Sequence, residues 1–150
     1  MREQKIIHKL IKTETDVVAV RRKAREIALG LGFDHQDQIR IATAVSEIAR
    51  NAYEYANGGG VYFRLEENKH VSFVIEVKDQ GPGIEKIKEI NLGTYVSPQG
   101  MGLGITGAKR LMDEVKINTS ATEGTQVILK KIIPFKKVLL TSKELQALTE

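Results

Sequence analysis

The sequence predicts an α/β protein, a two-layer sandwich in which helices pack on one face of a mixed β-sheet. Three observations predict it: two long segments with helical periodicity come first, two pairs of strand-like runs follow, and another helical segment lies between those pairs. The 150 residues are enough for one domain with a substantial core. We expect this domain to cover residues 1–133 and residues 134–150 to form a C-terminal extension.

The first half of the chain predicts a strand and two helices. Residues 5–12 form a short apolar run typical of a strand, and the cap-type residues 13–16 precede a helix that ends near Leu31. Its apolar residues recur every three or four positions: Val17, Val20, Ala24, Ile27 and Leu31. A second helix is expected from about Asp37 to Ala56, and Asn-Gly-Gly-Gly at 57–60 should end it. Its inward residues are expected to be Ile39, Ala42, Val45, Ala49 and Ala52.

The second half predicts two hairpins with helical segments between them. The hairpin strands are expected at 61–67 with 71–79 and at 115–119 with 125–133. Between them we expect a short helix at 85–90, an exposed loop at 91–99 and a helix at 104–113. Thr141 to Glu144 form a capping box that begins a last helix without a stop signal. This favours either a chain cut from a longer protein, in which the extension begins a linker helix, or a tail that docks on a partner.

The composition excludes several classes of protein. No apolar run reaches the roughly 18 residues of a membrane span, and the N-terminus lacks the apolar core of a secretory signal. The absence of cysteine excludes disulfides and thiolate metal sites. The net charge of +4 comes from basic residues interleaved with acids, which favours solvated helix faces over a nucleic-acid surface. We therefore expect a cytoplasmic protein that binds neither membrane nor nucleic acid directly.

Glu47 and Asn51 are four residues apart on the second predicted helix, so their side chains project from one face. A carboxylate can accept a proton, and a carboxamide oxygen is a good ligand for Mg²⁺. On spacing alone, a solvent-facing polar pair is the favoured interpretation of the two residues.

Asp79 ends a largely apolar strand and is followed by Gly81 and Gly83. A carboxylate at the mouth of a pocket could accept the exocyclic amine of adenine, and the glycines would let the backbone pass close to a flat ligand. The alternative is a simple Asp-x-Gly turn.

A second run of glycines covers residues 100–107, with the sequence GMGLGITG. The dinucleotide fingerprint is disfavoured because no convincing strand precedes it, and a phosphate P-loop is excluded because Ala108 follows Gly107. A glycine loop that leads into a helix remains, and the free N–H groups of that helix could hold phosphate. A surface loop without a ligand is the alternative.

The order of these motifs resembles the GHKL ATPase superfamily, whose nucleotide-binding domain is called the Bergerat fold. Within it, the stretches DQIRIATAVSEIARNAYEYA, DQGPGI and GITGAKRLMDEV are most similar to the anti-sigma-factor serine/threonine kinases, and closest to those that act as switch kinases of the stressosome. The similarity covers roughly residues 5–133.

The resemblance implies a site for ATP and Mg²⁺. Asn51 would hold the metal, Asp79 would accept the adenine amine, and Thr125 would add a hydroxyl beside Asp79 or a bridging water. Gly81 and Gly83 would shape the adenine pocket. The lid over the nucleotide and its hinge would be formed by Gly100, Gly102 and Gly104. Glu47 would be the catalytic base that orients an attacking hydroxyl.

The resemblance also implies a signalling function. The chain would transfer the γ-phosphate of ATP to a serine or threonine of a STAS-type regulatory partner. Two alternatives stay open: a nucleotide-dependent module that sequesters a sigma factor or another partner, and an N-terminal nucleotide-sensing domain of a larger signalling protein. A homodimer is also compatible with this group.

Other residues near the motifs carry weaker signals. Lys109 and Arg110 could contact phosphate, but a place on the solvated face of their helix is favoured, and Arg50 stays undecided. The three histidines do not cluster in the sequence, which weighs against a complete histidine kinase.

Overall fold

A computed structural model gives the fold for residues 1–81, 101–120, 122–134, 136 and 138–150, and for residues 101–103 it describes the backbone alone. The strands are β1 (Arg2–Ile11), β2 (Gly59–Glu67), β3 (Val71–Lys78), β4 (Glu114–Ser120) and β5 (Gly124–Ile132). The helices are α1 (Glu14–Gly30), α2 (His35–Ala56), α4 (Met101–Leu111) and α5 (Ser142–Thr149). The helix predicted at 85–90 and the loop at 91–99 lie outside the described residues.

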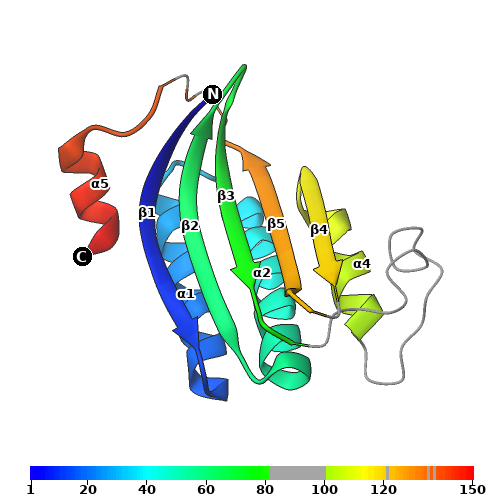
Figure 1. The fold of residues 1–150 in the computed structure, drawn as a ribbon. Coiled ribbons are helices and arrows are strands. Elements are labelled where there is room, and N and C mark those ends of the chain that lie inside the picture. The colour runs from blue at the N-terminus through cyan, green and yellow to red at the C-terminus, as the bar shows by residue number, and fades with distance from the viewer. Residues whose placement is uncertain (82–100, 121, 135, 137) are drawn as a thin grey trace.

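The strands form one sheet in the order β1-β2-β3-β5-β4, and α1, α2 and α4 cover one of its faces (Figure 1). The predicted two-layer sandwich is confirmed, but the prediction of a mixed sheet is wrong, since all four described pairings are antiparallel. No parallel pair forms among the described strands because β5 lies between β3 and β4 in the sheet. Those two strands run in the same direction, and β5 separates them.

The cap residues place α1 where the sequence predicts it. Thr13 accepts a hydrogen bond from the backbone N–H of Asp16, and the Asp16 carboxylate accepts from the N–H groups of Thr13 and Lys12. These backbone hydrogen bonds hold the pKa of Asp16 below its ordinary value. The predicted apolar stripe is confirmed, because all five of its residues, from Val17 to Leu31, are buried against the sheet and α2.

Helix α2 begins two residues earlier than predicted, after the N-cap Asp34. The inward position expected for Ile39 is wrong, since its side chain is 41% exposed. Gln38 occupies the inward position instead and donates to the carbonyl of Phe33, so the stripe continues through Ile41. Each helical residue is rotated by about 100° from the last, which turns position 39 toward solvent. The end of α2 is as predicted, with Asn57 as a left-handed C-cap.

The core lies between the sheet and the helices, and it determines which strand residues face them. On β3 the inward residues alternate as Phe73, Ile75 and Val77, all buried. The ring of Phe73 packs against Phe63 with 6.1 Å between centroids. This alternation places Asp79, two residues beyond Val77, on the helix-covered side of the sheet.

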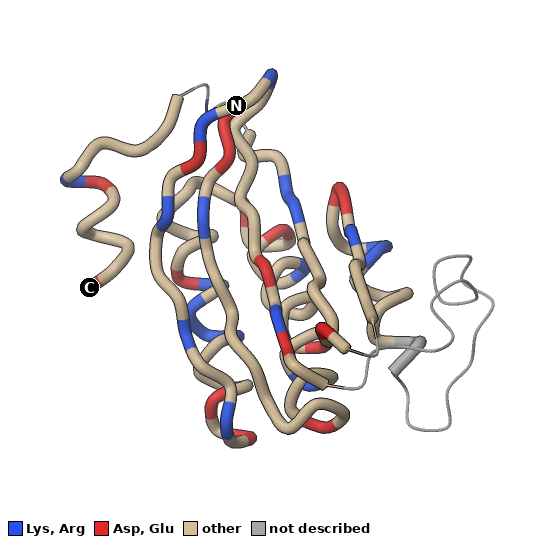
Figure 2. Tube along the Cα trace, viewed as in Figure 1, with Lys and Arg blue, Asp and Glu red and all other residues tan. Residues whose placement is uncertain are grey.

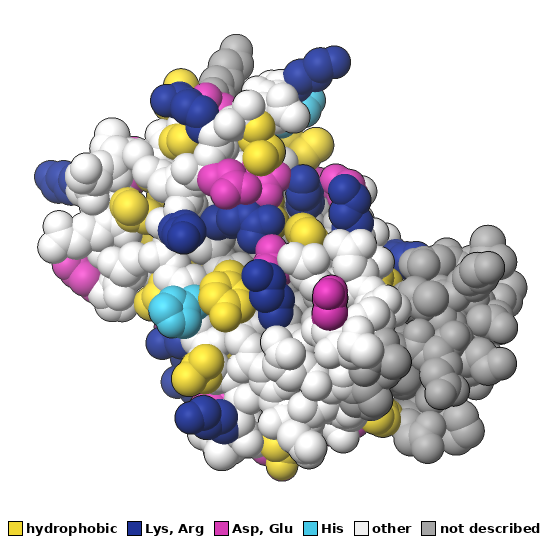
Figure 3. Space-filling model, viewed as in Figure 1, with side chains coloured by type: hydrophobic (Ala, Val, Ile, Leu, Met, Phe, Trp, Pro, Cys, Tyr) yellow, Lys and Arg dark blue, Asp and Glu magenta, His cyan; other side chains and the backbone are white. Residues whose placement is uncertain are grey.

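The opposite face of the sheet is open and carries interleaved charges (Figures 2 and 3). Arg64 contacts the carboxylates of Glu66 and Glu76 at 3.0 Å each, and Lys130 contacts Glu66 at 2.8 Å. Burial alone would raise the pKa of both glutamates, but the hydrogen bonds from Lys130, Lys78 and Arg64 outweigh it and lower the pKa. Both carboxylates are therefore held in the charged form.

The C-terminal extension packs against its own domain. The side-chain amide of Gln4 donates to the carbonyl of Leu140 at 2.9 Å and accepts from its N–H at 3.0 Å. Leu148 of α5 lies directly over Gly30 of α1. The predicted capping box is confirmed, with Thr141 as the N-cap of α5. Within the described part of the chain, every helix is too short or too polar to cross a membrane.

Candidate nucleotide site

The carboxylate of Asp79 is tied to the neighbouring backbone at the end of β3. Its Oδ1 atom accepts hydrogen bonds from the N–H of Gly81 at 2.9 Å and from the N–H of Thr125 at 3.1 Å. The Asp79 N–H donates in turn to the carbonyl of Thr125 at 2.9 Å. Both hydrogen bonds that described residues donate to this carboxylate end on Oδ1, which orients the other oxygen for a further donor.

Two glycines allow this close approach. Gly124 has φ +81°, and a Cβ atom there would overlap the carbonyl oxygen of Asp79. A Cβ atom at Gly81 would overlap the side chain of Ala56 at the end of α2. The glycine of the Asp-x-Gly sequence therefore brings the strand end against α2, as well as forming a turn.

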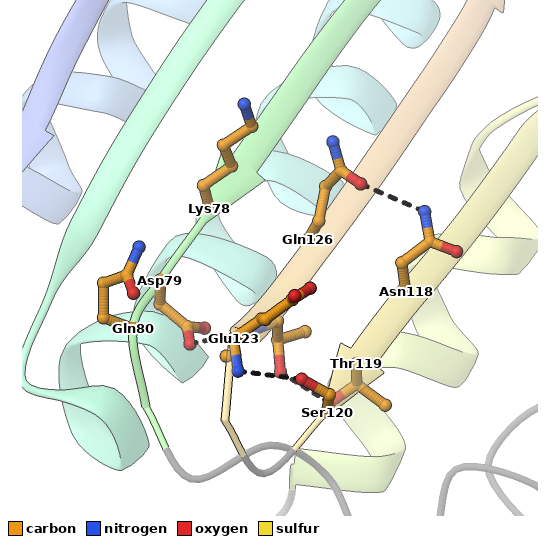
Figure 4. A pocket seen from close by; sticks show the side chains of 10 residues that line it. Lys78, Asp79, Gln80, Asn118, Thr119, Ser120, Glu123 and Gln126 are labelled. Atoms are coloured by element: carbon orange, nitrogen blue, oxygen red, sulfur yellow. Dashed lines mark hydrogen bonds between the residues drawn. The ribbon is translucent and has the colours of Figure 1, made fainter.

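Thr125 is placed beside Asp79, as the resemblance implies, but it binds Asp79 through its own backbone N–H and carbonyl. The hydroxyl of Thr125 instead lies 2.9 Å from the hydroxyl of Thr119 on β4. Asp79 and Thr119 both line a hollow of about 350 Å³. Figure 4 shows these two residues on either side of the end of β5.

The second part of the site lies on α2, where it faces α4. Glu47 is exposed and Asn51 is half-buried. A Cβ atom added to Gly104 would lie 3.3 Å from Glu47 Oε2 and 3.6 Å from Asn51 Nδ2. Gly104 thus lies directly beside both side chains, and the helices α2 and α4 approach closely at this glycine.

The two parts of the site are connected through α2. Asn51 and Ala56 are five residues apart on this helix, a rise of about 7.5 Å. Ala56 lies against Gly81, whose N–H binds Asp79. The structure therefore brings together Glu47, Asn51, Asp79, Gly81, Gly104 and Thr125 from four separate stretches of sequence.

The side chain of Asn51 has an unsatisfied group. Its Nδ2 atom is buried and has no hydrogen-bond partner among the described residues, and such groups are rare and costly in native proteins. Rotation of the carboxamide would present the oxygen, a hard ligand suited to Mg²⁺, at the same place. Among the described residues, no group of three His, Cys, Asp or Glu side chains could hold a metal ion.

Other predicted site residues are placed less completely. Gly83 and Gly100 lie outside the described residues. Gly102 and Gly104 lie within α4, which begins at Met101, three residues earlier than predicted. Gly104 therefore packs α4 against α2, and the role of the three glycines in the lid and its hinge stays a prediction.

The basic residues near the site are partly engaged elsewhere. Arg50 lies 3.8 Å from Glu14. Arg110 is exposed, as predicted, whereas Lys109 is half-buried and burial lowers its pKa.

Thr119 is the residue of this site that the sequence did not single out. The signal was present in the predicted hairpin, because a turn around Glu123 and Gly124 puts Thr119 opposite Thr125 in the register. The pairing by itself assigned no role to Thr119.

A family model described as the histidine kinase-like ATPase domain matches residues 11–131. The chain belongs to this family. The matched range contains every described residue of the site, from Glu47 to Thr125, which agrees with the GHKL resemblance of the motifs.

Relatives within the histidine kinase-like ATPase family agree with the narrower resemblance. The chain is 42% identical over 118 residues to the serine/threonine-protein kinase RsbT of Bacillus subtilis (strain 168), covering 78% of this chain and 89% of that protein. It is 34% identical over 96 residues to the anti-sigma F factor of Clostridium acetobutylicum, covering 61% of this chain and 67% of that protein.

Solved structures show the same fold. The RsbU and RsbW domains of Rv1364c from Mycobacterium tuberculosis match with a TM-score of 0.55 at 19% identity, over 93% of this chain and 35% of that one. This likeness concerns the fold of the histidine kinase-like ATPase domain.

Proposed function

We propose that this protein is an Mg²⁺-dependent serine/threonine protein kinase that acts in the cytoplasm on a STAS-type regulatory domain. The observation that carries the proposal is the placement of Glu47, Asn51 and Gly104 at one point of the α2–α4 contact, with an unsatisfied amide at Asn51. The 42% identity to a serine/threonine-protein kinase supports the reaction class.

The chemistry follows from the positions of the side chains. Asp79 would accept a hydrogen bond from the adenine amine, and Asn51 would provide a ligand to the metal. Bound Mg²⁺ would neutralise charge on the phosphates. The exposed carboxylate of Glu47 is accessible to the hydroxyl of a partner protein. Its role is to take the hydroxyl proton while the hydroxyl oxygen bonds to the γ-phosphorus and the bond to the β–γ bridging oxygen breaks, releasing ADP.

Nucleotide binding is tested by calorimetry with Mg-ATP. Asn51→Ala should abolish measurable binding in the presence of Mg²⁺, because it removes the metal ligand of the protein. The matched control is Asn68→Ala, at an exposed position in the β2–β3 turn. Equal affinity of Asn51→Ala and the wild type would contradict the proposal.

Phosphoryl transfer is tested separately with labelled ATP and a purified STAS domain. Glu47→Ala should keep ATP affinity and lower the transfer rate by about 10²–10⁴-fold, as expected for the loss of a general base. Glu114→Ala, an exposed carboxylate at the start of β4, is the control. Equal loss of binding and transfer would mean that Glu47 is misassigned.

A second candidate function is a nucleotide-dependent module that sequesters a sigma factor or similar partner. The match to an anti-sigma F factor favours it. In that case a stable complex should form with the partner in the presence of ATP, and the label should not be transferred to a STAS domain.

A further inference from the structure

A pair of hydroxyl groups lies on the helix-covered side of the sheet, next to Asp79. Thr119 and Thr125 are directly opposite each other in the β4–β5 pairing, and their Oγ1 atoms are 2.9 Å apart. Thr125 is only 8% exposed. On the same side of β4, the preceding alternate residues are Val115 and Ile117, so Thr119 ends an otherwise apolar column.

The backbone of Thr125 is already committed to Asp79. Its N–H donates to the Asp79 carboxylate and its carbonyl accepts from the Asp79 N–H. The hydroxyl is the polar group of Thr125 that makes no described hydrogen bond to Asp79, and so it is the one we consider for a ligand there.

The hydrogen bond between the two hydroxyls determines whether Thr125 can donate to a ligand or only accept from it. A hydroxyl carries one donor and two acceptor sites, and its proton rotates to suit its partner. If Thr119 donates to Thr125, the Thr125 proton stays available for a ligand acceptor. If Thr119 accepts instead, Thr125 presents only lone pairs.

We propose that Thr119 is a positioning residue of the nucleotide site, which orients the Thr125 hydroxyl and thereby contributes to the selection of the base. The inference rests on the proposed function, since it takes the group beside Asp79 to be adenine. The edge of this base carries an amine donor next to a ring nitrogen acceptor. The Asp79 carboxylate would accept from the amine, and the oriented Thr125 hydroxyl would donate to the ring nitrogen. Thr119 acts through Thr125 and does not itself contact the base.

The test compares ATP with ITP, whose base carries a carbonyl in place of the exocyclic amine, both as Mg²⁺ complexes in calorimetry. Thr119→Val keeps the shape and β-branching of the side chain and removes the hydroxyl. We expect it to weaken ATP binding by about 3- to 10-fold, the range for one lost hydrogen bond. ITP binding should change less, so the preference for ATP over ITP narrows. Thr119→Ser should restore the wild-type preference.

The coupling to Thr125 is measured with the double variant. If Thr119 acts through Thr125, Thr119→Val should have no further effect on ATP affinity in a Thr125→Val background. Independent, additive losses would overturn the proposal. Thr122→Val, at an exposed position in the β4–β5 turn, is the control and should leave the preference unchanged.

A purely structural role would give a different result. The melting temperature of Thr119→Val would then fall while its ratio of ATP to ITP affinity stayed at the wild-type value, and this outcome overturns the proposal. Should Thr119→Val not fold, Thr119→Ala is judged by the same ratio. A wild-type protein that does not bind Mg-ATP contradicts the proposed function instead, and so the two failures are distinguishable.

Discussion

The two parts of the candidate site differ in how firmly their side chains are held. At the strand end, Asp79 is held by two hydrogen bonds to the backbone of Thr125 and by one from the backbone N–H of Gly81. At the α2–α4 contact, Glu47 is exposed and the amide of Asn51 lacks a partner among the described residues. The difference indicates that the part proposed to recognise the base is pre-organised. The part proposed to handle the phosphates is completed only by its ligands.

Gly124→Ala should have the largest effect, because it changes the strand end, the part of the site whose side chains are firmly held. The residue has φ +81°, and a Cβ would overlap the Asp79 carbonyl, which is backbone and cannot rotate away. We expect the free energy of unfolding to fall by about 2–3 kcal/mol, as for strained backbone of this kind, and ATP binding to be lost. Urea denaturation and calorimetry measure the two effects.

The control for this change is Gly107→Ala. A Cβ atom there meets no described atom within 4 Å, and the residue lies inside α4. Alanine should therefore leave the free energy of unfolding unchanged or raise it by up to about 1 kcal/mol. If Gly124→Ala were as stable as Gly107→Ala, the strand end would not be the rigid part of the site.

Gly104→Ala should separate the two parts of the site, because it disturbs only the α2–α4 contact. The new methyl would lie 3.3 Å from Glu47 Oε2, a tight contact with an exposed side chain that can move aside. We expect a folded protein whose transfer of phosphate to the STAS domain is lower by about 10-fold, because Glu47 is displaced from its working position. Transfer at the wild-type rate would show that the position of Glu47 is not critical.

Much of this arrangement could be predicted from the sequence. Glu47 and Asn51 lie on a helix with clear periodicity and a glycine stop, so their shared face followed directly from their spacing. Asp79 followed from its position at the end of an apolar strand. These are local properties, and local properties are what periodicity and turn residues encode.

The features that were missed depend on contacts between distant segments. The packing of Gly104 against α2 was missed, because a glycine that permits close helix packing has the same sequence signal as a glycine in a loop. The antiparallel sheet depends on where β5 inserts, and strand patterns do not specify neighbours. Ile39 was misplaced because Gln38, a polar residue, takes the inward position by donating to the Phe33 carbonyl.

Low pH should produce the smallest of these effects, a loss of stability that begins in the strands β2 and β3. The folded-state pKa of Glu66 and Glu76 is lowered from the ordinary value of 4.5, so their contribution to stability is complete above that pH and is lost as the pH falls below it. Both lie on strands that flank or carry Asp79. We expect the melting temperature to fall below about pH 4.5, and less so in Glu76→Gln. Thermal melts of the wild type and of Glu76→Gln from pH 7 to pH 3 measure this difference. An equal fall of the melting temperature with pH in both proteins would contradict the prediction.

The bond between Gln4 and Leu140 has a consequence for association between molecules. An uncovered outer strand offers unpaired peptide groups that recruit strands from neighbouring molecules. The side chain of Gln4 on β1 binds the backbone of Leu140, so the extension lies along part of this outer strand. The extension should therefore limit edge-to-edge pairing of β1 with other molecules, and we expect a chain shortened before Val138 to aggregate more readily when concentrated.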